Sequence, residues 1–167
     1  MHLVRHATAR SFLDVARSFL VAHEAENNLI LGIAATVIEK PDRFGSTPAY
    51  FATVHDADDR VVATALRTPP HHLVLSDATE PAWSRVLDDV RLASPATPRA
   101  AAAARAAAAA RDDDDDDDDD VLPGVLGPVS TARAFADAWC AATGATKGAV
   151  TSERIYRLDR VVFPRGV

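Results

Sequence analysis

The sequence predicts a mixed α/β domain in which helices cover both faces of a sheet. Amphipathic helical segments and short apolar strands follow one another in the order helix, helix, strand, strand, strand, helix, strand, helix, strand. Residues 3–5 are a candidate for a short additional strand before the first helix. The chain has 167 residues, of which 48% are hydrophobic, and this is enough to bury the core of one domain.

Two helices are predicted between the candidate strand at 3–5 and the remaining strands. Between residues 8 and 20, apolar side chains recur at the spacing of one helical face. These side chains are Phe12, Leu13, Ala16, Phe19 and Leu20. A second helix is predicted from Glu24, since acidic residues suit the positive end of a helix. Pro41 prevents this helix from continuing much beyond Glu39.

Three strands are predicted next. Residues 50–54 and 61–66 flank the polar sequence HDADDR and form a hairpin around it. The nearly continuous apolar run at 61–66 indicates a strand buried on both faces. After two prolines, residues 73–75 form a third short strand.

The remaining elements lie on either side of a compositional break. A helix is predicted from about Pro81, since proline is tolerated in the first turn. A short strand follows at 121–128, and then a helix that begins near Ser130 or Thr131, either of which can cap it, and ends at Gly144. Residues 152–163 are rich in β-branched and aromatic side chains and are predicted to form the last strand.

Residues 93–120 have a composition unlike the rest of the chain. The alanine tract favours a helix but offers no large side chain for packing. The nine aspartates at 112–120 lie about 3.5 Å apart in an extended chain, well within the Debye length of about 8 Å, so they repel one another. We therefore expect a disordered insertion in one domain made of residues 1–92 and 121–163, followed by a tail at 164–167.

Charge and composition exclude several classes of protein. The net charge is −6, but without the nine aspartates of the tract the remainder would carry +3, which is too weak a basic balance to indicate nucleic-acid binding. No apolar stretch approaches the roughly 18 residues of a membrane helix, and no signal peptide is evident, so we expect a cytoplasmic protein that binds no membrane. The single cysteine, Cys140, is interpreted as a buried, inert thiol.

No sequence motif assigns a catalytic residue or a metal site. His71 and His72 are adjacent, and adjacent side chains of a strand point to opposite faces, so they cannot chelate one ion. The turn HDADDR lacks the central glycine and the final glutamate of a calcium loop. Nucleophile-elbow and phosphate-loop patterns are also absent. The catalytic residues are therefore unknown, and no metal site is expected.

Four segments, in this order, carry a resemblance to a known family. They are HEAENNLILGI (23–33), VVATALRTPPHHLVLS (61–76), LPGVLGPVSTARAFADAWCAATG (122–144) and RIYRLDRVV (154–162). Together they resemble the GNAT (GCN5-related N-acetyltransferase) family, and more narrowly the N-terminal half of a two-half bacterial GNAT protein. The resemblance implies transfer of an acetyl group from acetyl-CoA to an amine. It also implies a cofactor pyrophosphate held by backbone N–H groups between the fourth strand and the third long helix, through a Gln/Arg-x-x-Gly-x-Gly/Ala pattern.

The matching stretch, HLVLSDATEPAW (72–83), departs from that pattern. It contains no glycine to let a phosphate approach the backbone, and no lysine or arginine. Ser76, Asp77 and Thr79 can each cap the helix, while Asp77 and Glu80 add negative charge where a pyrophosphate would lie. The sequence therefore predicts that acetyl-CoA does not bind to this chain alone, and the cofactor-binding residues are unknown.

Acetyl transfer in this fold also often uses a tyrosine as the acid for the leaving thiolate. The helix at 130–143 has none, and Tyr156, on the predicted last strand, is interpreted as a core or sheet-face residue. Three interpretations follow. In the first, which the resemblance implies, the chain is equivalent to the N-terminal half of an acetyltransferase, and a C-terminal GNAT half supplies the cofactor site. In the second it is a non-catalytic module that pairs with a partner or a second copy, and in the third it is an inactive remnant.

Overall fold

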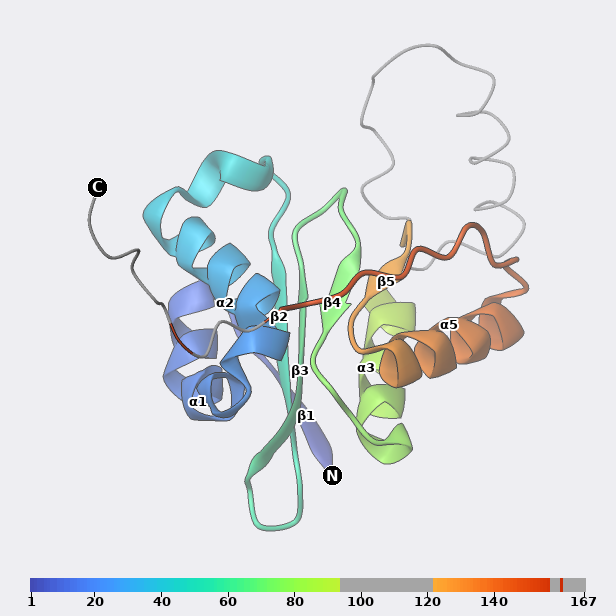
Figure 1. Cartoon of the computed structure of the whole chain (residues 1–167), viewed down its shortest axis with the longest axis horizontal. Coiled ribbons are helices and arrows are strands. Elements are labelled where there is room, and N and C mark those ends of the chain that lie inside the picture. Colours follow the sequence, from blue (N-terminus) through green and yellow to red (C-terminus); the bar gives the residue numbers. More distant parts are fainter. Residues whose placement is uncertain (94–121, 157–159, 161–167) are drawn as a thin grey trace.

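A five-stranded mixed sheet forms the centre of the molecule (Figure 1). The computed structural model describes residues 1–93, 122–156 and 160. The strands are β1 (His2–Arg5), β2 (Tyr50–His55), β3 (Val61–Arg67), β4 (Leu73–Leu75) and β5 (Val125–Leu126), and they are ordered β1-β2-β3-β4-β5 across the sheet. The first four strands pair as antiparallel neighbours, whereas β5 pairs in parallel with β4. The candidate strand at the N-terminus is thus present.

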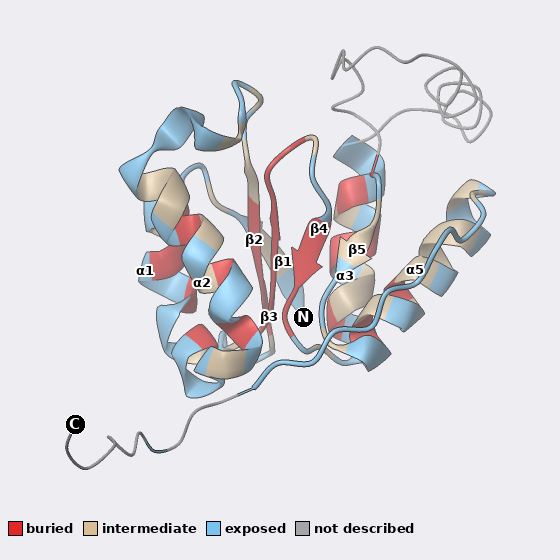
Figure 2. Cartoon of the chain, turned by 45° about the horizontal axis from the view of Figure 1, so that its top comes forward, coloured by how far each residue is buried: buried red, intermediate tan, exposed pale blue. Residues whose placement is uncertain are grey.

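Helices cover both faces of this sheet, as the sequence predicts. α1 (Ala9–Ala22) and α2 (Glu24–Glu39) lie on one face, and α3 (Glu80–Ala93) and α5 (Val129–Thr143) lie on the other (Figures 1 and 2). The short 3₁₀ helix η1 (Pro41–Phe44) follows α2. Each of the four predicted α-helices is present, and α2 has the predicted bounds.

Each face of the sheet has its own apolar core (Figure 2). Side chains of successive strand residues point to opposite faces. Phe51 therefore packs with α1 and α2, while its neighbour Ala52 packs with α3. In α1 the buried residues are Ala9, Phe12, Leu13, Ala16 and Leu20, which include four of the five predicted; Phe19 is only partly buried.

Side-chain hydrogen bonds fix the first helix pair. The Thr8 hydroxyl accepts from the Ser11 amide, and the Ser11 hydroxyl caps the Thr8 amide, so α1 begins in a capping box. The buried Asn27 side chain of α2 donates to the Leu20 carbonyl of α1 at 3.1 Å. The same carbonyl, in the last turn of α1, also accepts from the His23 amide at 3.3 Å, so the Asn27 bond is a second link at the junction of the two helices.

The turn between β5 and α5 depends on a glycine. Gly127 has a φ of +156°, and a Cβ added to it would lie 2.7 Å from the Leu75 carbonyl oxygen of β4. Such a separation is shorter than real Cβ contacts. The absence of a side chain therefore lets the chain pass close to β4 on its way into α5.

Several sequence-based expectations are wrong. Residues 152–156 do not form a strand, and Tyr156 is 83% exposed, so it is not a core or sheet-face residue. α5 begins at Val129 with no side-chain cap, so neither Ser130 nor Thr131 caps it. Cys140 is half-buried. Most of the expected strand at 157–163, the expected insertion at 94–120 and the tail at 164–167 lie outside the described residues.

Among the described helices, none combines the length and the apolar character that a membrane crossing requires.

Candidate functional site

The junction between β4 and α3 is the stretch where the sequence locates a potential cofactor cradle. Ser76, which follows β4, is buried, and its hydroxyl accepts from the Thr64 amide of β3 at 2.9 Å and donates to the Asp77 carbonyl. It therefore ties the end of β4 to β3 and does not cap α3 as expected. Thr79 lies immediately before the helix, and its carbonyl accepts from the Ala82 and Trp83 amides.

Thr131, in the first turn of α5, contacts the β4–α3 junction at Asp77 and Ala78. Its hydroxyl accepts from the Ala78 amide at 3.2 Å and donates to the Asp77 carboxylate at 3.1 Å. The side chain is 2% exposed. One backbone donor that could face an anion is thus already paired, and the Asp77 carboxylate bonds to Thr131 instead of capping α3. Pro81, in the first turn of α3, removes a further donor because it has no N–H.

The charge at this junction is also unfavourable for a phosphate. Asp77 and Glu80 are exposed, and none of the ion pairs found among the described residues involves either of them. Two like unit charges about 4 Å apart repel by about 1 kcal/mol in bulk water and about 4 kcal/mol near a protein surface. A helix N-terminus attracts an anion by only about 0.3–1 kcal/mol. At that separation, the repulsion from either carboxylate would equal or exceed the attraction of the helix N-terminus.

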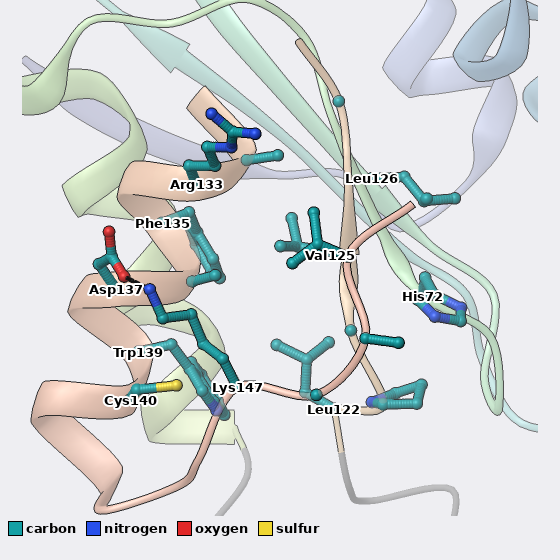
Figure 3. A pocket seen from close by; sticks show the side chains of 18 of the residues that line it. His72, Leu122, Val125, Leu126, Arg133, Phe135, Asp137, Trp139, Cys140 and Lys147 are labelled. Carbon is teal, nitrogen blue, oxygen red and sulfur yellow. Dashed lines mark hydrogen bonds and ion pairs between the residues drawn. The ribbon is translucent and has the colours of Figure 1, made fainter. Parts of the chain in front are cut away.

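A cleft of about 560 Å³ lies on the outer side of β5, between α5 and the extended residues 145–152 (Figure 3). Phe135 and Trp139 of α5 face Val125 and Leu122 across it. The rings of Phe135 and Trp139 stack with centroids 6.3 Å apart. The walls are thus apolar, and sequence reasoning missed the cleft because residues 145–152 carry no motif.

Polar groups at the edge of the cleft do not form a catalytic arrangement. Lys147 forms an ion pair with Asp137, and this hydrogen bond raises the pKa of Lys147 above its ordinary value. Lys147 is therefore a cation at neutral pH, and it cannot serve there as a base or an amine nucleophile. The Cys140 thiol also lines the cleft, but no hydrogen bond found in the described part of the chain joins it to a base. The cleft has features of a binding surface and lacks those of an active site.

Hydrogen bonds from the half-buried Tyr50, at the start of β2, and from Arg5, at the end of β1, connect the sheet to Asp89 of α3. The Tyr50 hydroxyl donates to Asp89 Oδ2 at 2.7 Å, and Arg5 Nε donates to the same oxygen at 2.8 Å. Burial, followed by the hydrogen bond to Asp89, raises the pKa of Tyr50 far above its ordinary value. Tyr50 is therefore neutral and engaged, and it is a structural contact between β2 and α3.

His71 and His72 lie in separate surroundings. His71 packs its ring edge against Phe44, whereas His72 lines the cleft beside Gly124. Both residues precede β4, so the expected reason for their separation, alternation within a strand, does not apply. His2, His55 and Asp59, by contrast, come together at the end of the sheet. Sequence reasoning missed this group because it depends on the register between β1 and β2.

In comparisons with known proteins, no family model, no curated protein and no solved structure matches the chain. Its function must therefore be argued from the geometry above.

Proposed function

We propose that this chain is a GNAT-like half-domain that does not bind acetyl-CoA by itself and that functions with a separate GNAT half carrying the cofactor site. The observation that carries this proposal is the closed β4–α3 junction. Thr131 is bonded to both the Ala78 amide and the Asp77 carboxylate, where the resemblance would locate the cofactor pyrophosphate.

The topology supports a GNAT-like fold over an unrelated α/β arrangement. Two helices separate β1 from β2, and β2, β3 and β4 then follow as antiparallel neighbours. The chain next enters α3 and returns to pair β5 in parallel with β4. Three of the four segments that carry the resemblance include α2, β3, β4, β5 and α5, whereas the fourth, at 154–162, forms no strand over its described residues 154–156.

The chemistry of the described residues supports a half without its own catalytic centre. Tyr50 is held neutral by Asp89, and Tyr156 is exposed outside any strand. Lys147 is paired with Asp137. These residues therefore provide no evident acid or base at the junction, and acetyl transfer would depend on groups in the other half.

Isothermal titration of acetyl-CoA into the full chain tests the closed junction. We expect no saturable heat, because a cofactor diphosphate would have to displace Thr131 and lie beside Asp77 and Glu80. Micromolar binding that an excess of 3′,5′-ADP displaces would contradict the proposal.

The proposed pairing with a separate GNAT half is tested independently. Reading the coding DNA beyond Val167 and beside this gene is expected to reveal a GNAT-like half with the Gln/Arg-x-x-Gly-x-Gly/Ala pattern. Mixing that half with this chain should give a complex by analytical ultracentrifugation. Failure of the two purified halves to associate would reject the pairing, even where the titration shows the junction to be closed.

A further inference from the structure

We propose that His2, His55 and Asp59 form a site for a divalent transition-metal ion of the Zn²⁺ type at the end of the sheet. The antiparallel register puts His2 directly opposite His55. The turn between β2 and β3 then brings Asp59 back to the same point: its Oδ1 lies 3.2 Å from His55 Nδ1 and 3.6 Å from His2 Nε2. The three ligand atoms all lie within 4.8 Å of one another.

The two separations that involve Asp59 are close to those of a tetrahedral site. Zinc–nitrogen and zinc–oxygen bonds of about 2.0–2.2 Å separate the ligand atoms by about 3.3–3.6 Å. The side chains of His2 and Asp59 are 56% and 79% exposed, so both can turn toward a shared ion, while the His55 side chain is only 8% exposed and stays fixed. The His2 ring stacks on the His55 ring with centroids 5.1 Å apart, and binding requires it to rotate out of that stack.

The buried side of His55 is already oriented by hydrogen bonds. His55 Nε2 lies 2.8 Å from the Thr53 hydroxyl, and that hydroxyl lies 2.9 Å from His6 Nε2. Thr53 is fully buried. A histidine that binds a metal commonly has its other ring nitrogen held by such a hydrogen bond, which fixes the tautomer and the direction of the ring.

The proton positions in this chain of hydrogen bonds are compatible with both states. Without a metal, His55 Nδ1–H donates to the Asp59 carbonyl, His55 Nε2 accepts from the Thr53 hydroxyl, and His6 Nε2–H donates to that hydroxyl. With a metal on Nδ1, His55 Nε2–H donates to Thr53, which donates to His6 Nε2. The buried Thr53 hydroxyl and the buried ring nitrogen of His55 are paired in each case, whereas the Asp59 carbonyl loses its His55 donor and, in an exposed turn, can accept from water instead.

The ligand set favours Zn²⁺ over Mg²⁺ or Ca²⁺. Imidazole nitrogens suit zinc, copper and nickel, whereas hard cations prefer oxygen ligands. Two imidazoles and one carboxylate supply three ligands and leave a fourth position to water, as in zinc sites with three protein ligands. The ion would join β1 to the β2–β3 turn, and binding to the folded state alone would raise the unfolding temperature.

Titration of the full chain with Zn²⁺, in a buffer with excess Mg²⁺, tests the site. Mg²⁺ suppresses binding that depends on carboxylates alone, including the aspartates at 112–120. We expect one Zn²⁺ per chain at this site and a loss of more than tenfold in affinity in both His2→Ala and Asp59→Asn. Co²⁺ in place of Zn²⁺ should give the intense visible absorption of a four-coordinate ion, and both variants should lose it.

Matched controls separate the site from general surface binding. Asp58→Asn changes the neighbouring exposed carboxylate of the same turn, and His23→Ala removes another exposed histidine. Both controls should bind Zn²⁺ like the wild type. The substituted side chains are all exposed, so circular dichroism should show folded proteins throughout. Wild-type affinity in Asp59→Asn or His2→Ala would overturn the proposal, and so would wild-type binding no tighter than that of a variant carrying both His2→Ala and Asp59→Asn.

Discussion

At the scale of single residues, Thr131 links two segments that are far apart in the sequence. Its one hydroxyl serves the Ala78 amide as acceptor and the Asp77 carboxylate as donor, across 53 and 54 positions of the chain. The sequence predicted that Thr131 lies at the start of a helix. It could not predict these contacts, because they depend on how α5 packs beside α3. The sequence-based interpretation assigned the residue to a cap for its own helix, since local hydrogen bonding is the only role that sequence spacing can indicate.

A Thr131→Val substitution tests the contribution of this hydroxyl to stability. Valine keeps the shape and removes both hydrogen bonds, so we expect the free energy of unfolding to fall by about 1–3 kcal/mol, since each bond contributes about 0.5–1.5 kcal/mol. Urea unfolding followed by tryptophan fluorescence measures the change. Ser130→Ala, at the exposed neighbour, should alter stability by no more than about 0.5 kcal/mol. Equal stabilities of the two variants would contradict the role given to Thr131.

Tyr50 provides a second residue-scale prediction. Its pKa is raised in the folded state, so the folded state favours the neutral phenol, and this contribution is present below about pH 10 and is lost as the pH rises above it. In a Tyr156→Phe variant, Tyr50 is the only tyrosine. We expect its ultraviolet tyrosinate absorbance to appear only as the protein unfolds.

The Asp89 carboxylate can be tested in the same background. Asp89→Asn removes a negative charge that raises the pKa of Tyr50 and replaces a carboxylate acceptor with an amide, so the phenol should ionise at a lower pH. Asp88→Asn changes the exposed carboxylate beside it and should leave the titration unaltered. An ordinary tyrosine titration in folded protein with Asp89 intact would contradict the network.

At the scale of elements, periodic patterns predicted well and short irregular segments did not. The bounds of α2 follow from its acidic start and from Pro41, which are local signals. The predicted hairpin is confirmed, and the Asp56 carboxylate closes its turn by accepting from the Asp58 and Arg60 amides. The expected strand at 152–163 is absent over its described residues 152–156, because β-branched composition describes only a preference, and these exposed residues pair with none of the described strands.

The turn between β5 and α5 gives an element-scale prediction. Gly127→Ala would bring a methyl group to 2.7 Å from the Leu75 carbonyl, so the backbone of β5 or β4 must shift. We expect a loss of more than about 1 kcal/mol in unfolding free energy, measured by guanidinium unfolding. Gly148→Ala is the control, because nothing lies within 4 Å of its added Cβ. Equal midpoints for the two variants would show that the turn tolerates a side chain.

At the scale of the whole molecule, the sequence predicted the fold class and most elements but not the arrangement that could carry function. Helix faces and strand order follow from local periodicity. The group of His2, His55 and Asp59 depends on strand register, and the cleft beside β5 depends on where residues 145–152 run. The negative charge at the β4–α3 junction was readable from Asp77 and Glu80, whereas its closure by Thr131 required three-dimensional contacts.

The two cores of the sheet also differ in when they can form during synthesis. The core beneath α1 and α2 uses residues from Ala9 to Val74, whereas the opposite core also needs Leu122 and Phe135. A chain leaving the ribosome N-terminus first can complete one layer once Val74 has emerged, while the second waits for Phe135, 61 residues further along the chain. Until then that face is covered by α3 alone. On that face, three positions of the central strands β2 and β3 are alanines: Ala52, Ala63 and Ala65. Their small side chains limit the apolar surface that a nascent chain would expose to chaperones or to other nascent chains.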